Sequence, residues 1–163
     1  MKRILFVDDE ANVLDAIRRM LHAYRDRWET EFVTSGQAAL LATRERAFDI
    51  VVSDLLMPGM DGAELLGHIR EQFPSAARIV LSGYSEPGLA ARAAKVAHRV
   101  LAKPCDAEQL KTTIEHFCYL QDKYPNPPLR QVTGSTSEPE ELEAECSGAT
   151  HLAAGAGALT HVA

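Results

Sequence analysis

Apolar residues in the first 120 positions occur in short runs that alternate with longer segments of helical periodicity. The short runs are mostly aliphatic, which predicts strands at 3–7, 28–34, 48–52, 78–81 and 99–102. In the longer segments apolar residues return every three or four positions, which predicts helices at 13–24, 35–46, 61–73, 86–96 and from 106 onward. Ser35, Asp61 and Asp106 stand where N-terminal caps are expected for three of these helices.

Five strand–helix units in succession indicate an α/β protein with one doubly wound parallel sheet. The predicted strands are almost continuously apolar, as in sheets that helices cover on both faces. In such sheets ligands bind beyond the carboxyl ends of the strands, near the point where the strand order reverses. Functional residues are therefore expected at those ends.

The composition is typical of one globular domain, with 163 residues of which 46% are apolar and 25% charged. Cys105, Cys118 and Cys146 have neither CxxC nor CxxH spacing, so we expect reduced thiols rather than disulfides or a zinc site. No run nears the ~18 apolar residues of a membrane span, and the apolar stretch before Asp8 is too short for a signal peptide. We expect a cytoplasmic protein without a membrane partner.

Charge divides the chain into two parts. The net charge is −6 and the pI about 5.5, which removes the usual electrostatic basis for binding nucleic acid directly. Six acidic and two basic residues lie in 121–163, where a proline cluster precedes an acidic run and an Ala- and Gly-rich end. We expect a domain at 1–120 and a flexible tail at 121–163, with a helix over 138–146 as the alternative for part of it. This tail has no room for a helix-turn-helix, so the expected partners are proteins.

Polar residues follow four of the five predicted strands. Asp8 and Asp9 follow the first, Asp54 the third, Ser82 the fourth and Lys103 the fifth. Three carboxylates in one crevice repel one another and need a cation, and an all-oxygen ligand set favours Mg²⁺. A lysine and a hydroxyl opposite the carboxylates suit a phosphoryl group.

Each of these residues also has a purely structural explanation. Asp8 and Asp9 can complement a helix dipole, Asp54 can cap a turn, and Ser82 and Lys103 can belong to ordinary loops. Convergence at four strand ends of one sheet favours the functional interpretation. The six histidines show no ligand spacing and are expected to be structural or exposed: His22, His68, His98, His116, His151 and His161.

Four segments together resemble the receiver domain of bacterial two-component response regulators. They are VDDE at 7–10, SDLLMPGMDG at 53–62, LSG at 81–83 and AKP at 102–104, and the resemblance covers about 1–120. It implies a flavodoxin-like fold with strand order 2-1-3-4-5. It also implies that Asp54 accepts a phosphoryl group from the phosphohistidine of a sensor histidine kinase or of a phosphotransfer protein.

The resemblance further assigns the roles around Asp54. Asp9 is expected to bind Mg²⁺ directly, Asp8 largely through water, Asp54 through one carboxylate oxygen and Leu56 through its backbone carbonyl. Lys103 neutralises phosphoryl charge, and its bond to the following proline is expected to be cis. The protein would then be a phosphoacceptor that promotes its own phosphorylation and slow dephosphorylation, not an enzyme acting on separate substrates.

Output is expected through a surface formed by the helix at 86–96, the strand at 99–102 and the last helix. Ser82 would donate to the phosphoryl oxygen and bias this surface, which contacts a downstream protein or forms a homodimer. Receivers commonly carry an aromatic residue where this chain has Val100, so the usual aromatic switch is absent. Leu56 and Tyr84 stand where side chains can flank the phosphoryl group and restrict the attacking water, and packing as an ordinary loop aromatic is the alternative for Tyr84.

Three alternatives remain at this level. The run at 96–110 is similar to receivers joined to HD-related output domains, so the chain can be a fragment of a larger regulator. A receiver-like adaptor that is never phosphorylated is a second hypothesis. A haloacid-dehalogenase-like phosphohydrolase is a third, although such enzymes carry DxD after the first strand and the third position here is Glu10.

Overall fold

The computed structural model describes residues 1–83 and 87–124. Strands and helices alternate along the chain, and one 3-10 turn follows the first helix. Their bounds are β1 (Lys2–Val7), α1 (Ala11–Leu21), η1 (His22–Tyr24), β2 (Trp28–Val33), α2 (Gly36–Glu45), β3 (Ile50–Asp54), α3 (Gly62–Gln72), β4 (Ala77–Ser82), α4 (Pro87–Ala94), β5 (Arg99–Ala102) and α5 (Ala107–Lys123). The predictions for Tyr84 and for the tail beyond Tyr124, including a helix over 138–146, lie outside the described residues.

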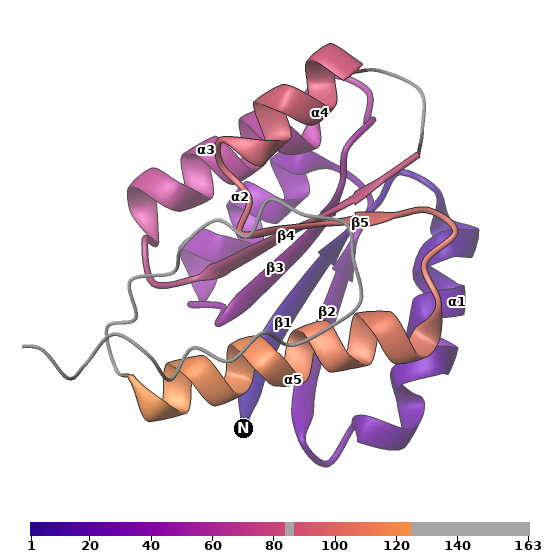
Figure 1. Ribbon diagram of the computed structural model, residues 1–163, viewed down its shortest axis with the longest axis vertical. Coiled ribbons are helices and arrows are strands. Elements are labelled where there is room, and N and C mark those ends of the chain that lie inside the picture. Colours follow the sequence, from indigo (N-terminus) through magenta and orange to yellow (C-terminus); the bar gives the residue numbers. More distant parts are fainter. Residues whose placement is uncertain (84–86, 125–163) are drawn as a thin grey trace, which may run out of the picture.

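All five strands belong to one parallel sheet of order β2-β1-β3-β4-β5, as expected for a flavodoxin-like receiver. The first crossover moves from β1 to the edge strand β2, and the next returns across β1 to β3, so the order reverses between β1 and β3. Figure 1 shows α2, α3 and α4 on one side of the sheet and α1 and α5 on the other. The predicted architecture of a doubly wound sheet is confirmed.

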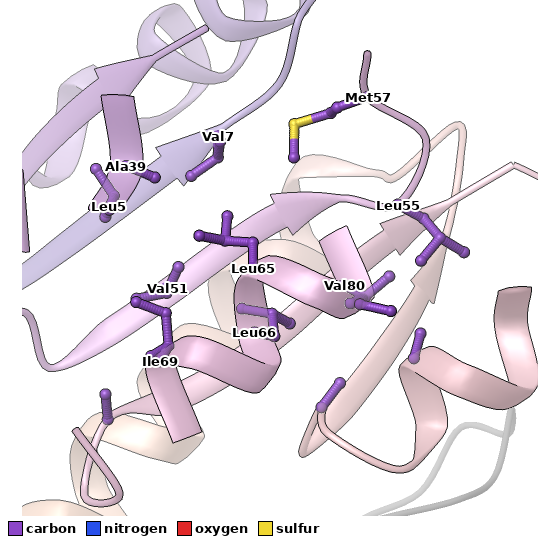
Figure 2. Close-up of a cluster of buried hydrophobic side chains, with 14 of the residues drawn as sticks. Leu5, Val7, Ala39, Val51, Leu55, Met57, Leu65, Leu66, Ile69 and Val80 are labelled. Carbon is purple, nitrogen blue, oxygen red and sulfur yellow. The ribbon is translucent and has the colours of Figure 1, made fainter. Parts of the chain in front are cut away.

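The sheet separates two apolar clusters because successive strand residues face opposite sides. One cluster joins alternate residues of the central strands to α2, α3 and α4, and Figure 2 shows Leu5, Val51 and Val80 facing Leu65, Leu66 and Ile69 of α3. The other cluster packs the intervening residues, such as Ile4, Phe6 and Ile79, against α1 and α5. Burial on both faces explains why the strands are continuously apolar in sequence.

Helix caps follow the expected pattern in three cases. The side chains of Ser35, Asp61 and Asp106 accept hydrogen bonds from backbone N–H groups in the first turns of α2, α3 and α5. Helix α1 has no such side-chain cap at Glu10, and Asp8 Oδ1 instead accepts from the Glu10 N–H at 2.9 Å.

Two elements, β3 and α1, are displaced from their predicted bounds for a physical reason. β3 covers Ile50–Asp54 rather than 48–52, because the parallel ladder continues through Ser53 and Asp54 to Val80 and Leu81 of β4. The predicted helix at 13–24 ends as α1 at Leu21, and η1 forms the remaining turn. The last helix, predicted from 106 onward, is α5 and ends at Lys123.

His98 is a buried member of a polar pair with Arg78, both at the end of the sheet where β4 and β5 begin. The guanidinium of Arg78 donates to the carbonyls of Val96 and Ala76 and lies 2.7 Å from His98 Nε2. Burial, together with the Arg78 charge, lowers the pKa of His98 to about 4. The imidazole is therefore neutral near pH 7 and serves the fold.

Cys105 and Cys118 are free thiols, whereas Cys146 lies outside the described residues. Burial raises the pKa of Cys118 to about 11, so this thiol is a poor nucleophile. Among the described helices, none is both long and apolar enough to cross a membrane.

Candidate functional site at the carboxyl ends of the strands

The parallel sheet gathers the strand-end residues at one edge. Asp8 directly follows β1, and Asp54 closes β3, the neighbouring strand in which Ser53 pairs with Val7. Ser82 closes β4, and Lys103 directly follows β5, whose Ala102 pairs with Ser82. The site thus lies at the reversal of strand order, where ligands bind in this class of sheet.

Three carboxylates form a compact cluster. Asp8, Asp9 and Asp54 each place one carboxylate oxygen so that all three atoms lie within 4.8 Å of one another. Asp8 is 1% exposed and Asp54 7%, whereas Asp9 is open to solvent. Negatively charged oxygen donors from two buried and one exposed side chain fit a hard divalent cation that keeps some of its water, as Mg²⁺ does.

Lys103 joins the two buried carboxylates. Its Nζ lies 2.7 Å from Asp8 Oδ2 and 2.7 Å from Asp54 Oδ1. Burial by itself would lower the pKa of Lys103, but the hydrogen bonds and charges of Asp54 and Asp8 raise it above its usual value. Lys103 therefore carries a positive charge at neutral pH. The bond from Lys103 to Pro104 is cis, as expected.

Asp54 is held in an environment that disfavours its ionised form. Burial and the neighbouring charge of Asp8 raise the pKa of Asp54 above its usual value, although the hydrogen bond and charge of Lys103 oppose the shift. A carboxylate of raised pKa is more basic and therefore a better nucleophile than an ordinary one. The arrangement suits attack on an electrophilic phosphorus.

Backbone packing holds Asp54 in place. A Cβ at Gly62 would lie 2.1 Å from the Asp54 carbonyl oxygen, so only glycine fits at the start of α3. The buried hydroxyl of Ser53 donates to the same carbonyl at 2.8 Å, and Gly62 N–H donates to Leu55 O at 2.9 Å. Sequence reasoning assigned no role to Gly62 or Ser53. A glycine directly after the capping Asp61 was the available signal.

The remaining predicted site residues lie around the cluster rather than in it. Ser82 is half-buried, and its Oγ donates to Gly83 O at 2.9 Å rather than to a carboxylate of the cluster. The Leu56 side chain is 45% exposed. Val100 is 37% exposed on β5. Tyr84 lies outside the described residues.

Comparison with known proteins gives a consistent family. Residues 4–115 match the model of the response regulator receiver domain. The chain is 34% identical over 125 residues to the uncharacterized transcriptional regulatory protein YesN of Bacillus subtilis (strain 168), covering 72% of this chain and 32% of YesN. It is 33% identical over 113 residues to the transcriptional regulatory protein ZraR of Escherichia coli O157:H7, covering 69% of this chain and 25% of ZraR. The chain thus spans a quarter to a third of these two curated relatives.

The fold agrees with solved receiver structures. The crystal structure of the signal receiver domain of an HD domain-containing protein from Pseudomonas fluorescens Pf-5 superposes with a TM-score of 0.71 at 30% identity. That alignment covers 75% of this chain and 98% of the other. With the strand order, the acidic cluster and the matched segment together, this chain belongs to the response regulator receiver domain family.

Proposed function

We propose that Asp54 accepts a phosphoryl group from the phosphohistidine of a sensor histidine kinase or of a phosphotransfer protein. The observation that carries this proposal is the position of Lys103 Nζ, 2.7 Å from both Asp8 and Asp54 beside the third carboxylate of Asp9. Receiver domains are signalling domains, and this arrangement provides the nucleophile Asp54 and the ammonium of Lys103 in one crevice. In the reaction a carboxylate oxygen of Asp54 forms the new bond to phosphorus as the N–P bond breaks and the imidazole nitrogen keeps the electron pair.

The surrounding residues prepare Asp54 for this step. Burial, which raises the pKa of Asp54, increases the basicity of the attacking oxygen. Lys103 can turn from Asp54 toward the transferred group, because its ammonium is a point charge on a flexible stem. The packing of Gly62 against the Asp54 carbonyl keeps the strand end fixed during the transfer.

The carboxylates of Asp8, Asp9 and Asp54 and the backbone carbonyl of Leu56 would hold Mg²⁺. When bound, this cation supplies neutralisation of charge on the transferring oxygens. The donor set supports the assignment, because it contains hard oxygen ligands from two adjacent strand ends and one exposed side chain that leaves room for water.

Output through protein contact follows from this proposal. Ser82 at the end of β4 would rotate from Gly83 O to donate to the phosphoryl oxygen and bias the surface of α4, β5 and α5. Val100 is exposed on this surface and supplies an apolar contact for a downstream protein or for a second copy in a homodimer. Leu56 would flank the phosphoryl group and slow its hydrolysis. The partner must bind the two states of this surface with different affinity.

A larger regulator is compatible with the same chemistry. The Pseudomonas fluorescens receiver comes from an HD domain-containing protein, and YesN and ZraR are named as transcriptional regulatory proteins. We propose that the signal passes by protein contact to a separate partner, with an output domain on the same polypeptide as the alternative. Direct nucleic-acid binding by this chain is not proposed, because its net charge is −6.

The proposal is tested by incubating the chain with acetyl phosphate and Mg²⁺ and measuring the intact mass over time. Wild type should gain the mass of one phosphoryl group, and Asp54→Asn should gain none. Asp122→Asn is the matched control, since Asp122 is exposed and pairs with Lys2 at the opposite end of the sheet. A phosphoryl group retained by Asp54→Asn would overturn the assignment. An unmodified wild type would indicate the adaptor, and continuous phosphate release a hydrolase.

A further inference from the structure

We propose that an ion pair between Asp61 and Arg92 couples the phosphoacceptor loop to α4 by a route independent of Ser82. The inference rests on the proposed phosphorylation of Asp54 and names how that event is transmitted. Arg92 Nη1, in the last turn of α4, donates to Asp61 Oδ2 at 2.9 Å across 31 positions of sequence. Two helices on the same face of the sheet are thereby joined at the residue that caps α3.

Asp61 binds both helices at once. Its Oδ1 accepts from the Glu64 N–H at 2.8 Å and so caps α3, while Oδ2 accepts from Arg92. The cap fixes the orientation of the carboxylate, so Arg92 meets an acceptor that is already ordered. The Asp61 charge also lies between the positive end of the α3 dipole and the guanidinium, and both attract it.

The backbone connects Asp61 directly to the phosphoacceptor. Gly62 follows Asp61, and its Cα is so close to Asp54 that an added Cβ would lie 2.1 Å from the Asp54 carbonyl oxygen. Gly62 N–H also donates to Leu55 O at 2.9 Å. A displacement of the Asp54–Leu55 backbone therefore displaces the start of α3 and, with it, the carboxylate that holds Arg92.

Helix α4 has few other attachments in the described part of the chain. Leu89 and Ala93 are buried against the cluster of Figure 2, and Arg70 of α3 donates to the Lys95 carbonyl at 3.2 Å just beyond α4. Val100 carries no ring that could follow a movement of Ser82. The ion pair is thus a polar connection from the phosphoacceptor loop to α4 that does not pass through the end of β4.

The pair is suited to transmitting a change rather than to stabilising the fold. The Arg92 side chain is 57% exposed and that of Asp61 23%, and ion pairs of this kind contribute little to overall stability. Arg92 is therefore expected to matter for the response of α4 and hardly at all for folding or for the chemistry at Asp54.

The test compares amide chemical shifts of residues 88–95 with and without beryllofluoride and Mg²⁺ in five proteins: wild type, Ser82→Ala, Arg92→Gln, Ser82→Ala/Arg92→Gln and Arg70→Gln. Arg70→Gln is the matched control because it removes the same charge and a different polar contact between α3 and the end of α4. Phosphorylation by acetyl phosphate is measured separately for each protein by intact mass.

We expect Arg92→Gln to lose roughly half of the shift changes in α4, Ser82→Ala to keep a measurable part, and the double variant to keep almost none. Arg92→Gln and Arg70→Gln should accept phosphate like wild type, and Arg70→Gln should keep the α4 response. A double variant that responds like Ser82→Ala alone would overturn the inference, as would equal losses in Arg92→Gln and Arg70→Gln. If wild type takes up no phosphate, the proposed function fails and the coupling fails with it, whereas phosphate uptake with an unchanged response in Arg92→Gln overturns the coupling alone.

Discussion

The Cα of Gly62 lies against the carbonyl oxygen of Asp54, so closely that a methyl group on that carbon would sit 2.1 Å from the oxygen. The contact joins the end of β3 to the first residue of α3, and the Ser53 hydroxyl donates to the same oxygen. The phosphoacceptor is therefore fixed through its main chain, while its side chain faces the carboxylates and Lys103.

Gly62→Ala is expected to destabilise the protein by about 3 kcal/mol, because backbone rather than a flexible side chain must move to admit the methyl group. Urea unfolding measures the change. Gly67→Ala on the same helix is the control, since no atom lies within 4 Å of a Cβ at Gly67 and alanine favours a helix interior by about 0.5–1 kcal/mol. Equal effects of the two substitutions would contradict the close approach.

Asp54→Asn is expected to leave the free energy of unfolding unchanged or to raise it. The pKa of Asp54 is raised in the folded state, chiefly by burial, so its ionised form opposes folding above that pKa. Asparagine keeps the shape without the charge, and Lys103 retains Asp8 as a partner.

Urea unfolding at neutral pH without Mg²⁺ measures the free energy of unfolding of Asp54→Asn, and Asp49→Asn is the control. Asp49 accepts from the Arg3 N–H at 2.7 Å and pairs with Lys2, so its carboxylate supports the fold and its loss should lower stability. Greater destabilisation by Asp54→Asn than by Asp49→Asn would contradict the prediction.

Mg²⁺ is expected to raise the melting temperature of wild type, and Asp9→Ala should largely remove this rise. A ligand that binds only the folded state at about one hundred times its dissociation constant adds about 2.7 kcal/mol of stability. Asp122→Ala removes an equal charge at the opposite end of the sheet and should respond to Mg²⁺ like wild type. Differential scanning fluorimetry over a Mg²⁺ series measures all three. A full response in Asp9→Ala would locate the metal elsewhere.

His98 should make the fold sensitive to acid. Its pKa is lowered from 6.5 to about 4, so between these values the unfolded chain binds a proton that the folded chain excludes. Stability from the neutral imidazole is therefore present above pH 6.5 and is lost as the pH falls toward 4. Between about pH 7 and pH 5 the loss should be about 2 kcal/mol.

His98→Gln removes the titrating group, so its free energy of unfolding should fall less over that interval than that of wild type. The comparison uses the slope with pH, which a uniform loss of stability in the variant does not change. His22→Gln, the same substitution at an exposed histidine, is the control. Parallel curves for wild type and His98→Gln would show that another group causes the acid sensitivity.

The local pattern of apolar residues predicted the elements, because the strands of a sheet covered on both faces are almost continuously apolar. The strand order came from the family resemblance. β3 was placed two residues early since Phe48 is apolar and Ser53 and Asp54 are polar. The ladder to β4 depends on backbone groups, and it continues through both polar residues. Tyr24 continues the helical period in sequence, yet it lies in η1, and its ring stacks on that of Trp28 with the ring centroids 5.1 Å apart.

The strand-end residues could be predicted to meet because every parallel strand delivers its carboxyl end to the same edge. Two other contacts could not be predicted, that of Asp61 with Arg92 and that of Arg78 with His98. Each depends on how helices and loops pack, across 31 and 20 positions of sequence respectively. Side chains of this kind have no periodic signature. The close approach of Gly62 to Asp54 likewise depends on the angle at which α3 leaves its loop.

The separation of the core into two clusters has a consequence for how such a chain can diverge. The sheet separates the cluster packed against α1 and α5 from the cluster packed against α2, α3 and α4. The effects on stability of one substitution in each cluster should therefore add nearly independently. One side of the core can therefore be repacked while the other side keeps its packing. The sheet acts as a partition that lets the two halves of the core evolve as separate traits of one small domain.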